Sequence, residues 1–491
     1  MKENQDIWAL LFSYFSAAVD WLNGLLWGSV LIYLLIGAGL YFTLRLKFIQ
    51  VRHFGHMFSV LKNSRQGDSS GVSSFQALCT SLAARVGTGN LAGVAVALTA
   101  GGPGAIFWMW LIAFIGMSTS FVESTLAQVF KVKDKHGNFR GGPAYYMQFG
   151  LKARWMGIVF SLCLILAFGL VFCAVQSNSI SEAVESAFSV PRWITGVATV
   201  LLTALVVFGG LRVIASVAEV VVPFMALGYL AVALIVVGMN ISELPAIFKL
   251  IIGSAFGVQQ AAGGLAGYGV AKAMMEGIQR GLFSNEAGMG SAPNAAATAA
   301  PTPPHPASQG YVQMLGVFVD TLVICTATAS IILLSGVKIT GGVEGVSLTQ
   351  AALSSQVGGW GNGFVAIALF FFAFTSIMAN FYYAEINVDF LKDSDTAIRI
   401  YRVLGLCMVM FGAVAKLQIV WDMANLAMAL MAIVNLIAIL LLSNIAFKVA
   451  RDYNCQRAAG KTPFFDLRKF PELKPKLAPG VWEQQKSSER T

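Results

Sequence analysis

Charged side chains are scarce in this sequence. Asp, Glu, Lys and Arg make up 12% of its 491 residues, whereas soluble domains carry about 25%. Hydrophobic residues make up 57%, more than a soluble protein could cover with polar surface. These proportions exclude an ordinary soluble class. We therefore interpret the chain as a series of membrane helices of about 20 residues each and not as two or three soluble domains.

Residues that perform enzymatic chemistry are also few. The four histidines lie in predicted loops, and the sequence has no HExxH zinc motif, no GxSxG elbow and no paired-carboxylate pattern. The six cysteines show no CxxC or metal-ligand spacing, so we interpret them as small core residues without a disulfide framework. These absences argue against an enzyme.

Long uncharged runs predict about eleven membrane-spanning helices. Leu22–Leu44 and Met423–Phe447 contain no charged residue. The first run follows Asp6 and Asp20, which favours a retained helix over a cleaved signal peptide. A further Gly-rich apolar stretch, 244–268, is either interfacial, re-entrant or a twelfth span. We expect helices near 22–44, 75–99, 103–130, 155–188, 193–210, 213–238, 270–298, 310–336, 361–387, 397–415 and 420–447.

Basic residues are concentrated in three segments. Segments 45–74, 131–154 and 448–491 hold 21 of the 33 Lys and Arg residues, and all three fall on one side when eleven helices are drawn. Because positive loops face the cytoplasm, the N-terminus is predicted outside and the C-terminus inside. Topology thus accounts for the +9 net charge without nucleic-acid binding. The tail from Pro463 onward is expected to lie loosely in the cytosol.

Glycine interrupts two of the predicted helices. Gly87-Thr88-Gly89-Asn90 lies in the second, and Gly288-Met289-Gly290 lies in the seventh, which runs in the opposite direction. Two broken antiparallel helices, five apart, indicate an inverted repeat with a binding site near the membrane midplane. The alternative is chance, because 49 residues of the chain are glycine.

The first break combines binding chemistry with a plainer structural interpretation. Exposed amides around Thr88 suit a carboxylate, and exposed carbonyls suit a cation. Gly89 and Gly93 also have the GxxxG spacing of close helix packing, so both interpretations stay open. Gln176, in the fourth helix, likewise fits either ligand binding or an interhelical hydrogen bond.

The second break places Ser284, Asn285 and Glu286 inside a membrane segment. A carboxylate at that depth indicates function, and the alternative is an ion pair of Glu286 with Arg85 or Arg280 that only holds helices together. We expect structural pairing for three other acids at membrane level, Glu123, Asp320 and Asp422.

Two adjacent hydroxyls, Thr375 and Ser376, lie in a stretch with no charge from Phe364 to Tyr383. Together with backbone carbonyls they could complete a sodium shell, since hard cations take oxygen ligands. Alternatively, each hydroxyl bonds the carbonyl four residues earlier in its own helix.

The segment Gly101–Gly116, GGPGAIFWMWLIAFIG, resembles the signature of the alanine/glycine:cation symporter family. Gly141–Met147, Gly87–Gly93 and Ser284–Gly290 are similar to the same family, and the similarity runs from about residue 20 to 450. The resemblance implies an all-α integral membrane protein with a leucine-transporter-type fold, in which two inverted five-helix repeats follow one extra N-terminal helix. It also implies sodium-coupled import of alanine or glycine by alternating access across the bacterial inner membrane.

This fold implies a division of the chain. The expected segments are an extracytoplasmic N-terminus (1–21), the extra helix (22–44), the first repeat (75–238), an external connection (239–269), the second repeat (270–447) and a cytoplasmic tail (448–491). The expected partners are the amino acid, sodium and the lipid bilayer.

The resemblance also assigns the site. Substrate would contact residues of both breaks and of the helices beside them, namely Gly87, Thr88, Gly89, Asn90, Gln176, Phe283, Ser284, Asn285 and Asn380. Co-transported sodium would lie between the carbonyls near Ala83 and Val86 and the hydroxyls of Thr375 and Ser376.

One residue departs from the family. Many members carry Trp where this chain has Asn380, and a smaller residue there would enlarge the pocket. A larger neutral amino acid such as glutamine, taken up with sodium or protons, is therefore the alternative to alanine or glycine.

Overall fold

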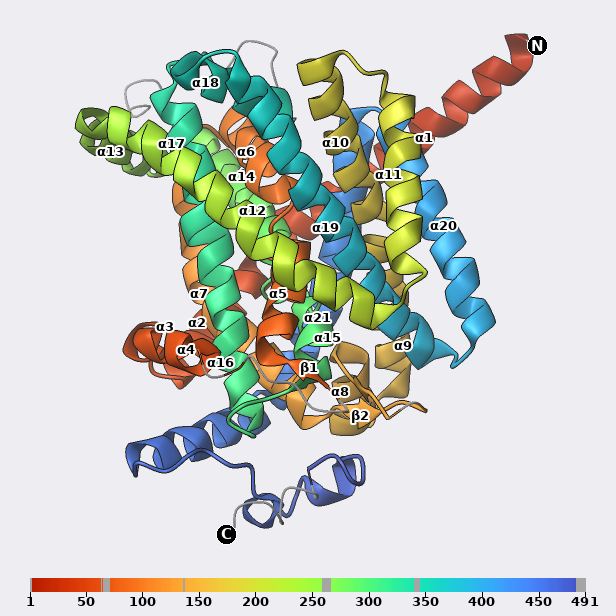
Figure 1. Ribbon diagram of the computed structural model, residues 1–491, viewed down its shortest axis with the longest axis vertical. Helices are drawn as coiled ribbons and strands as arrows, with labels where there is room; N and C mark the ends of the chain where they lie inside the picture. The colour runs from red at the N-terminus through yellow and green to blue at the C-terminus, as the bar shows by residue number, and fades with distance from the viewer. Residues whose placement is uncertain are drawn as a thin grey trace.

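Long helices connect the two ends of the molecule in Figure 1. Helix is the form that suits a chain in hydrocarbon, because each backbone N–H and C=O is bonded within its own segment. The computed structural model describes residues 2–62, 64, 71–135, 137–257, 266–339 and 345–482. Within these ranges, eight helices are long and apolar enough to cross a membrane, or nine when one bent pair counts as a span. The figure of eleven stays a prediction.

Five of these eight are uninterrupted helices. They are α7 (Gly104–Val129), α12 (Leu211–Met239), α19 (Trp360–Leu391), α20 (Asp395–Val414) and α21 (Leu417–Ala458). The apolar helix α11 (Arg192–Val207) has 16 residues and is not among the eight. α21 extends eleven residues past the expected helix end at 447, so the start of the segment assigned to the tail is helical.

Three further spans contain a π-helical stretch. They are α1 (Lys2–Leu26), η1 (Trp27–Leu31) and α2 (Ile32–Arg45); α9 (Arg154–Leu164), η3 (Ile165–Phe172) and α10 (Cys173–Phe188); and α16 (Pro306–Val317), η5 (Phe318–Cys325) and α17 (Thr326–Leu334). π-Helical turns within α-helices are frequent at functional sites. Here η3 and η5 both supply residues that border the helix breaks described below.

Short elements occupy the two ends of the bundle. They are α3 (Ile49–Arg52), α4 (Phe54–Lys62), α8 (Pro143–Gly150), η4 (Ile241–Glu243), α13 (Leu244–Ala255), α18 (Gly345–Val357), η6 (Leu467–Lys469), η7 (Lys474–Lys476) and the hairpin of β2 (Val132–Lys133) with β3 (Phe139–Arg140). The 12 residues of α13 span about 18 Å, too little to cross about 30 Å of hydrocarbon. The rest of the ambiguous 244–268 stretch lies largely outside the described residues.

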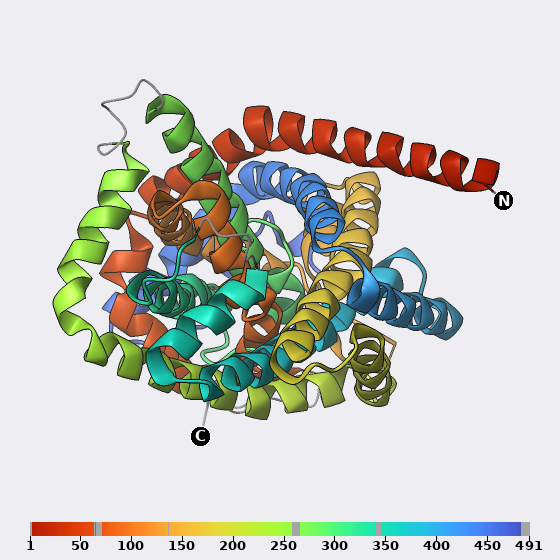
Figure 2. The same ribbon diagram turned by 90° about the horizontal axis from the view of Figure 1, so that it is seen from above.

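The extra N-terminal helix is longer than expected. The predicted 22–44 segment is the second half of a helix that begins at Lys2, and α1 projects beyond the bundle in Figure 2. Its continuation, α2, packs against α7 and α21, so this helix lies at the edge of the bundle and not among the helices that hold the breaks.

Both predicted breaks are present. α5 (Ser74–Arg85) is separated from η2 (Gly89–Gly93) and α6 (Val94–Gly101), and the two halves are bent by 50°. α14 (Ala266–Asn285) is separated by a turn from α15 (Ala292–Thr298). Three residues of that turn have left-handed backbone: Glu286 at φ 59°, Gly288 at 95° and Gly290 at 80°. The glycines reach such angles without steric cost, which explains why the helix stops there.

A short parallel ladder fastens the two broken helices to each other. β1 (Val72–Ser73), directly before α5, pairs with β4 (Ala299–Ala300), directly after α15. Ser73 also caps α5 reciprocally with Gln76, at 3.0 Å in both directions. The half-helices on this side of the breaks are therefore held together at their outer ends.

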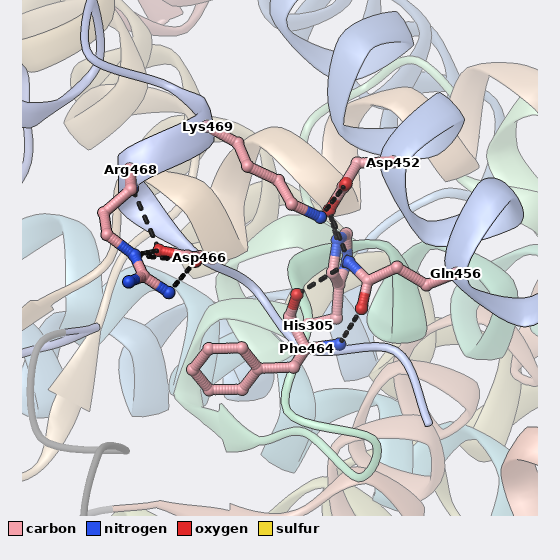
Figure 3. Close-up of polar contacts among 7 residues, drawn as sticks. All are labelled: His305, Asp452, Gln456, Phe464, Asp466, Arg468 and Lys469. Atoms are coloured by element: carbon pink, nitrogen blue, oxygen red, sulfur yellow. Dashed lines mark hydrogen bonds and ion pairs between the residues drawn. The ribbon is translucent and has the colours of Figure 1, made fainter. Parts of the chain in front are cut away.

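The segment beyond α21 folds against the bundle, so the expectation of a loose tail was wrong for its described residues. Phe465 and Trp482 are buried, with ring centroids 5.2 Å apart. Figure 3 shows Asp452 of α21 between His305 and Lys469, at 3.4 and 2.7 Å. The sequence did not predict this packing, because the apolar residues of the tail are separated by polar ones and come together only in the folded chain.

Candidate functional site

The first break frees backbone carbonyls. Helical geometry ends at Val86, where ψ is 84°. The Gly87 N–H donates to Asn90 Oδ1 at 2.9 Å and to Arg85 O at 3.0 Å. In a continuous helix this N–H would donate to the carbonyl of Ala83. That carbonyl is therefore released from its own helix and needs another partner.

The freed carbonyls face α19. The Ser376 hydroxyl is 2.7 Å from Ala83 O, 3.5 Å from Val86 O and 3.0 Å from Phe372 O of its own helix. Three of the four residues predicted to bind sodium thus come together. The fourth does not join them, because the Thr375 hydroxyl bonds the Phe372 carbonyl at 3.0 Å within α19.

The Thr88 amide of the first break faces α10, and the two glycines beside it lie close to α10 and α14. Thr88 N–H donates to Gln176 Oε1 at 3.0 Å. A Cβ atom on Gly87 would lie 2.8 Å from the same oxygen, and one on Gly89 would lie 3.1 Å from the Phe283 ring. Neither glycine leaves room for a side chain, so the backbone itself lines this side. Five of the predicted substrate residues are brought together here.

A buried carboxylate lies between the two breaks. Asp320 of η5 accepts hydrogen bonds from Asn90 Nδ2, Ser284 Oγ and Thr321 Oγ1, each at 2.7 Å. All four residues are fully buried, and among the described residues no cation lies within 4.0 Å of this carboxylate. Sequence analysis treated Asp320 as a structural acid and missed that it joins Asn90 of one break to Ser284 of the other.

The second break is held by two carboxylates that accept hydrogen bonds from neutral donors. Ser291 Oγ donates to Glu286 Oε2 at 2.6 Å. Glu123 of α7 accepts from Gly288 N–H at 3.3 Å and from Asn435 Nδ2 at 3.0 Å. Asn435 also donates to Gly288 O at 2.8 Å. The turn between α14 and α15 is thereby fixed to α7 and α21.

The ion pairs considered for Glu286 are not formed. Arg280 lies 3.6 Å from Glu276, and Arg85 Nη1 donates to the Gln313 carbonyl at 3.2 Å. Within the described part of the chain, neither arginine has an oxygen of Glu286 within 4.0 Å. The carboxylate of Glu286 instead bonds Ser291 within the turn between α14 and α15.

Several buried polar atoms near the breaks lack hydrogen-bond partners among the described residues. They are Thr88 Oγ1, Asn285 Nδ2 and both amide atoms of Asn380, whose near neighbour is the Cys173 thiol. An unpaired polar atom in an apolar interior costs about 1–3 kcal/mol unless something satisfies it. These atoms could form hydrogen bonds to a polar ligand at the site.

Aromatic rings close the site on the side of α21. Phe283 lies between Phe172 of η3 and Trp421 of α21, with ring centroids 4.8 and 4.9 Å away. Sequence analysis identified Phe283 but missed the other two. Trp421 is more than 130 positions away in the chain, and the only signal was an isolated large aromatic residue at the start of the last helix.

This geometry defines a class. Two helices broken at the middle of a membrane bundle, with freed carbonyls and with an amide bonded by a side chain of another helix, are typical of a secondary transporter. The fold itself is shown by a solved structure. The crystal structure of MhsT in complex with L-phenylalanine superposes with a TM-score of 0.56 at 11% identity, over 78% of this chain and 99% of that one. The chain thus has the leucine-transporter-type fold.

The sequence comparisons identify the family. The model of the sodium:alanine symporter family matches residues 12–467. The chain is 53% identical over 444 residues to the probable sodium/glutamine symporter GlnT of Bacillus subtilis, covering 90% of this chain and 91% of that protein. It is 39% identical over 451 residues to the sodium/alanine symporter AgcS of Methanococcus maripaludis, covering 90% and 97%. The chain belongs to the sodium:alanine symporter family, which is a family of multi-pass membrane transporters and not of enzymes.

Proposed function

We propose that this protein imports a small neutral amino acid, alanine or glycine, together with sodium by alternating access. The observation that carries the proposal is the first helix break, whose carbonyls at Ala83 and Val86 meet the Ser376 hydroxyl while its Thr88 amide donates to Gln176. One break therefore presents acceptors for a cation and a donor for a carboxylate.

For sodium, the proposed ligands are the oxygens of Ala83, Val86 and Ser376. The Ser376 hydroxyl proton has an alternative acceptor in Phe372 O, 3.0 Å away. When the hydroxyl proton turns to the Phe372 carbonyl, the lone pairs of Ser376 Oγ face the carbonyls of Ala83 and Val86. A monovalent cation can then bind between these three oxygens. Such an ion would tie α5 to α19 and favour the arrangement that binds the amino acid.

For the amino acid, the proposed contacts are the amides of Gly87, Thr88 and Gly89 for its carboxylate, and Phe283 as an apolar wall. In this structure Gln176 Oε1 accepts the hydrogen bond of the Thr88 amide. When the amino acid binds, its carboxylate would replace Gln176 or accept from the same amide beside it. The unpaired atoms of Asn285 and Asn380 remain proposed contacts. Asn90 and Ser284 would act mainly through Asp320, which both already bond.

A second substrate class has support of its own. The relative at 53% identity is named a probable sodium/glutamine symporter. Asn380 offers a buried amide that has only the Cys173 thiol as a near polar neighbour among the described residues and that could bond a side-chain amide. Glutamine is thus the specific alternative.

Topology is also part of the proposal. We place the N-terminus outside and the C-terminus in the cytoplasm, with repeats near 75–238 and 270–447, because the three basic segments share one side. Under this assignment, the β1–β4 ladder closes the cytoplasmic end of the two broken helices.

The test is uptake by the purified protein in liposomes. Labelled alanine, glycine and glutamine are offered separately with an inward sodium gradient, and again with choline replacing sodium. We expect alanine or glycine to accumulate only with sodium. Faster accumulation of glutamine would select the alternative, and accumulation of all three without sodium would refute sodium coupling.

A further inference from the structure

A strongly basic pocket lies far from the helix breaks, where α2 and α3 meet the end of α21. It encloses about 790 Å³. Five cationic side chains line it: Arg45, Lys47, Arg52, Arg451 and Arg457. No carboxylate is among its lining residues, and among the described residues none of the five cations has an acidic oxygen within 4.0 Å. The pocket therefore carries uncompensated positive charge.

Neighbouring titratable groups respond to that charge. Burial lowers the pKa of His53 to about 4, with Arg457 and Arg52 as the next causes. Burial and Arg457 also lower the pKa of His56 to about 4. Both histidines are neutral at physiological pH, and His53 bonds the Tyr311 hydroxyl at 2.7 Å. They add no charge, so the guanidinium and ammonium groups supply the positive charge that an anion entering the pocket would meet.

Part of the pocket is held in place. The Arg45 guanidinium lies 4.8 Å from the Phe447 ring centroid and bonds the Tyr41 hydroxyl at 3.2 Å. Lys47 and Phe48 have left-handed backbone, at φ 54° and 55°. Such a conformation costs about 1–2 kcal/mol for a residue other than glycine, and here it turns the chain sharply between α2 and α3. The strained turn brings Lys47 to the pocket wall.

Exposed apolar residues adjoin the pocket in the chain. Leu44, Phe48 and Val51, here called the apolar rim, are 62%, 46% and 57% exposed and directly neighbour the lining residues Arg45, Lys47 and Arg52. The pocket also lies at the end of the molecule where the chain terminates (Figure 1), the side on which basic loops accumulate. Positive charge inside and exposed apolar side chains outside match the two parts of a membrane lipid at the bilayer surface.

We propose that this pocket binds the headgroup of an anionic phospholipid from the cytoplasmic leaflet. The arginines would bond the phosphate oxygens, for which the guanidinium geometry is suited, and the apolar rim would contact the acyl chains. A zwitterionic lipid is disfavoured because no lining carboxylate receives its amine. The lipid would connect the N-terminal helix to α21, two parts that lie more than 390 positions apart in the chain.

Native mass spectrometry of the purified protein tests this proposal by counting lipids bound. The probes are phosphatidylglycerol, phosphatidylcholine with the same acyl chains, and inorganic phosphate. The pocket variant is Arg451→Gln with Arg457→Gln, two exposed residues of α21. The matched control is Lys249→Gln in α13 with Lys338→Gln just after α17, which changes the net charge equally. Figure 1 shows α13 and the end of α17 at the end of the molecule opposite the C-terminus.

We expect one phosphatidylglycerol to bind the wild type in preference to phosphatidylcholine. The pocket variant should weaken its binding by about tenfold or more, since each basic residue near an anionic surface contributes about a factor of five. The control should keep wild-type binding. Should the double variant fold poorly, Lys47→Gln removes a single exposed cation and should weaken binding severalfold.

Three results would overturn the proposal. They are equal losses in pocket and control variants, equal binding of the two lipids, and complete displacement of phosphatidylglycerol by inorganic phosphate. The last would assign the pocket to a free anion.

Discussion

The two helix breaks differ in the side chains that bond their freed backbone groups. Each leaves backbone groups without helical partners in the middle of the membrane bundle. At the second break the chain supplies acidic partners: Glu123 takes the Gly288 amide, and Glu286 takes the Ser291 hydroxyl. At the first break the backbone groups have neutral partners: Gln176 accepts from the Thr88 amide, and the Ser376 hydroxyl donates to the freed carbonyl of Ala83. The carboxylate of Asp320 there bonds the Asn90 side chain.

This difference distinguishes the break that supports the structure from the break that binds ligands. A buried carboxylate bonded to backbone and amide donors is costly to disturb, so the second break is a rigid part of the scaffold. A neutral hydroxyl or amide can exchange its partner for an ion or a carboxylate without leaving a charge unpaired. We therefore place the ligands at the first break and assign the second a positioning role, connected to the first through Asp320.

The largest effect is expected from Gly87→Ala, which places a methyl group at the first break. Its Cβ would overlap Ser376 Oγ and lie 2.8 Å from Gln176 Oε1. Overpacking of this kind costs about 1–3 kcal/mol, and here it displaces the proposed ligands of both substrates. Sodium-driven uptake in liposomes should fall by about a hundredfold.

Gly93→Ala is the matched control for that variant, because its Cβ would meet its nearest atoms at 3.7 and 3.8 Å, an ordinary contact distance. It should transport at nearly the wild-type rate. Equal damage from both alanines would show that helix packing, and not the ligand site, sets the requirement for glycine.

The next largest effect is expected from Ser376→Ala, which removes an oxygen proposed to bind sodium. Loss of a hydrogen-bonding group from a charged partner costs about 1.5–3 kcal/mol. The sodium concentration for half-maximal uptake should rise about ten- to a hundredfold, whereas substrate affinity at saturating sodium should change much less.

Ser330→Ala controls for removal of a hydroxyl within a membrane helix, since the Ser330 hydroxyl bonds the Thr326 carbonyl at 2.8 Å. Its sodium dependence should match the wild type. An unchanged half-saturation in Ser376→Ala would remove this residue from the ion site.

A smaller effect on ion dependence is expected at the second break. Glu286→Gln keeps an oxygen that can accept from Ser291, so we expect a loss of about 1 kcal/mol in stability, seen as a lower thermal unfolding midpoint. The sodium and pH dependence of uptake should stay within about twofold of the wild type. A variant that folds as well as the wild type and loses proton-driven uptake would make Glu286 a coupling residue and remove the contrast between the breaks.

Local sequence predicted the breaks but not their partners. Glycines at 87, 89, 288 and 290 mark where helices fail because backbone freedom is a local property. The partners are set by packing between distant segments: Gln176 reaches Thr88 from 88 positions away, and Asn435 reaches Glu123 from 312. Composition placed Asp320 in the membrane, but only the fold shows that it joins Asn90 to Ser284. Knowledge of the family supplied the pairing of Ser376 with Ala83, which no spacing along the chain reveals.

The smallest effect is expected from Thr375→Val, and it tests the assignment most sharply. Family resemblance placed both hydroxyls in the ion site, but the structure gives them different partners. Ser376 faces the freed carbonyls of α5, whereas Thr375 bonds carbonyls of its own helix at 2.9 and 3.0 Å. Valine keeps the branched shape and removes only the hydroxyl, so packing is preserved.

A hydroxyl that bonds its own helix contributes little to ion binding, and the carbonyls it leaves remain bonded within the helix. The sodium concentration for half-maximal uptake should therefore change by less than about twofold in Thr375→Val, measured beside Ser376→Ala in the same liposomes. If the valine variant instead raises it as far as the alanine variant does, Thr375 must turn toward α5 when sodium binds. The ion would then be held by both hydroxyls, and the neutral partners of the first break would rearrange more than this structure shows.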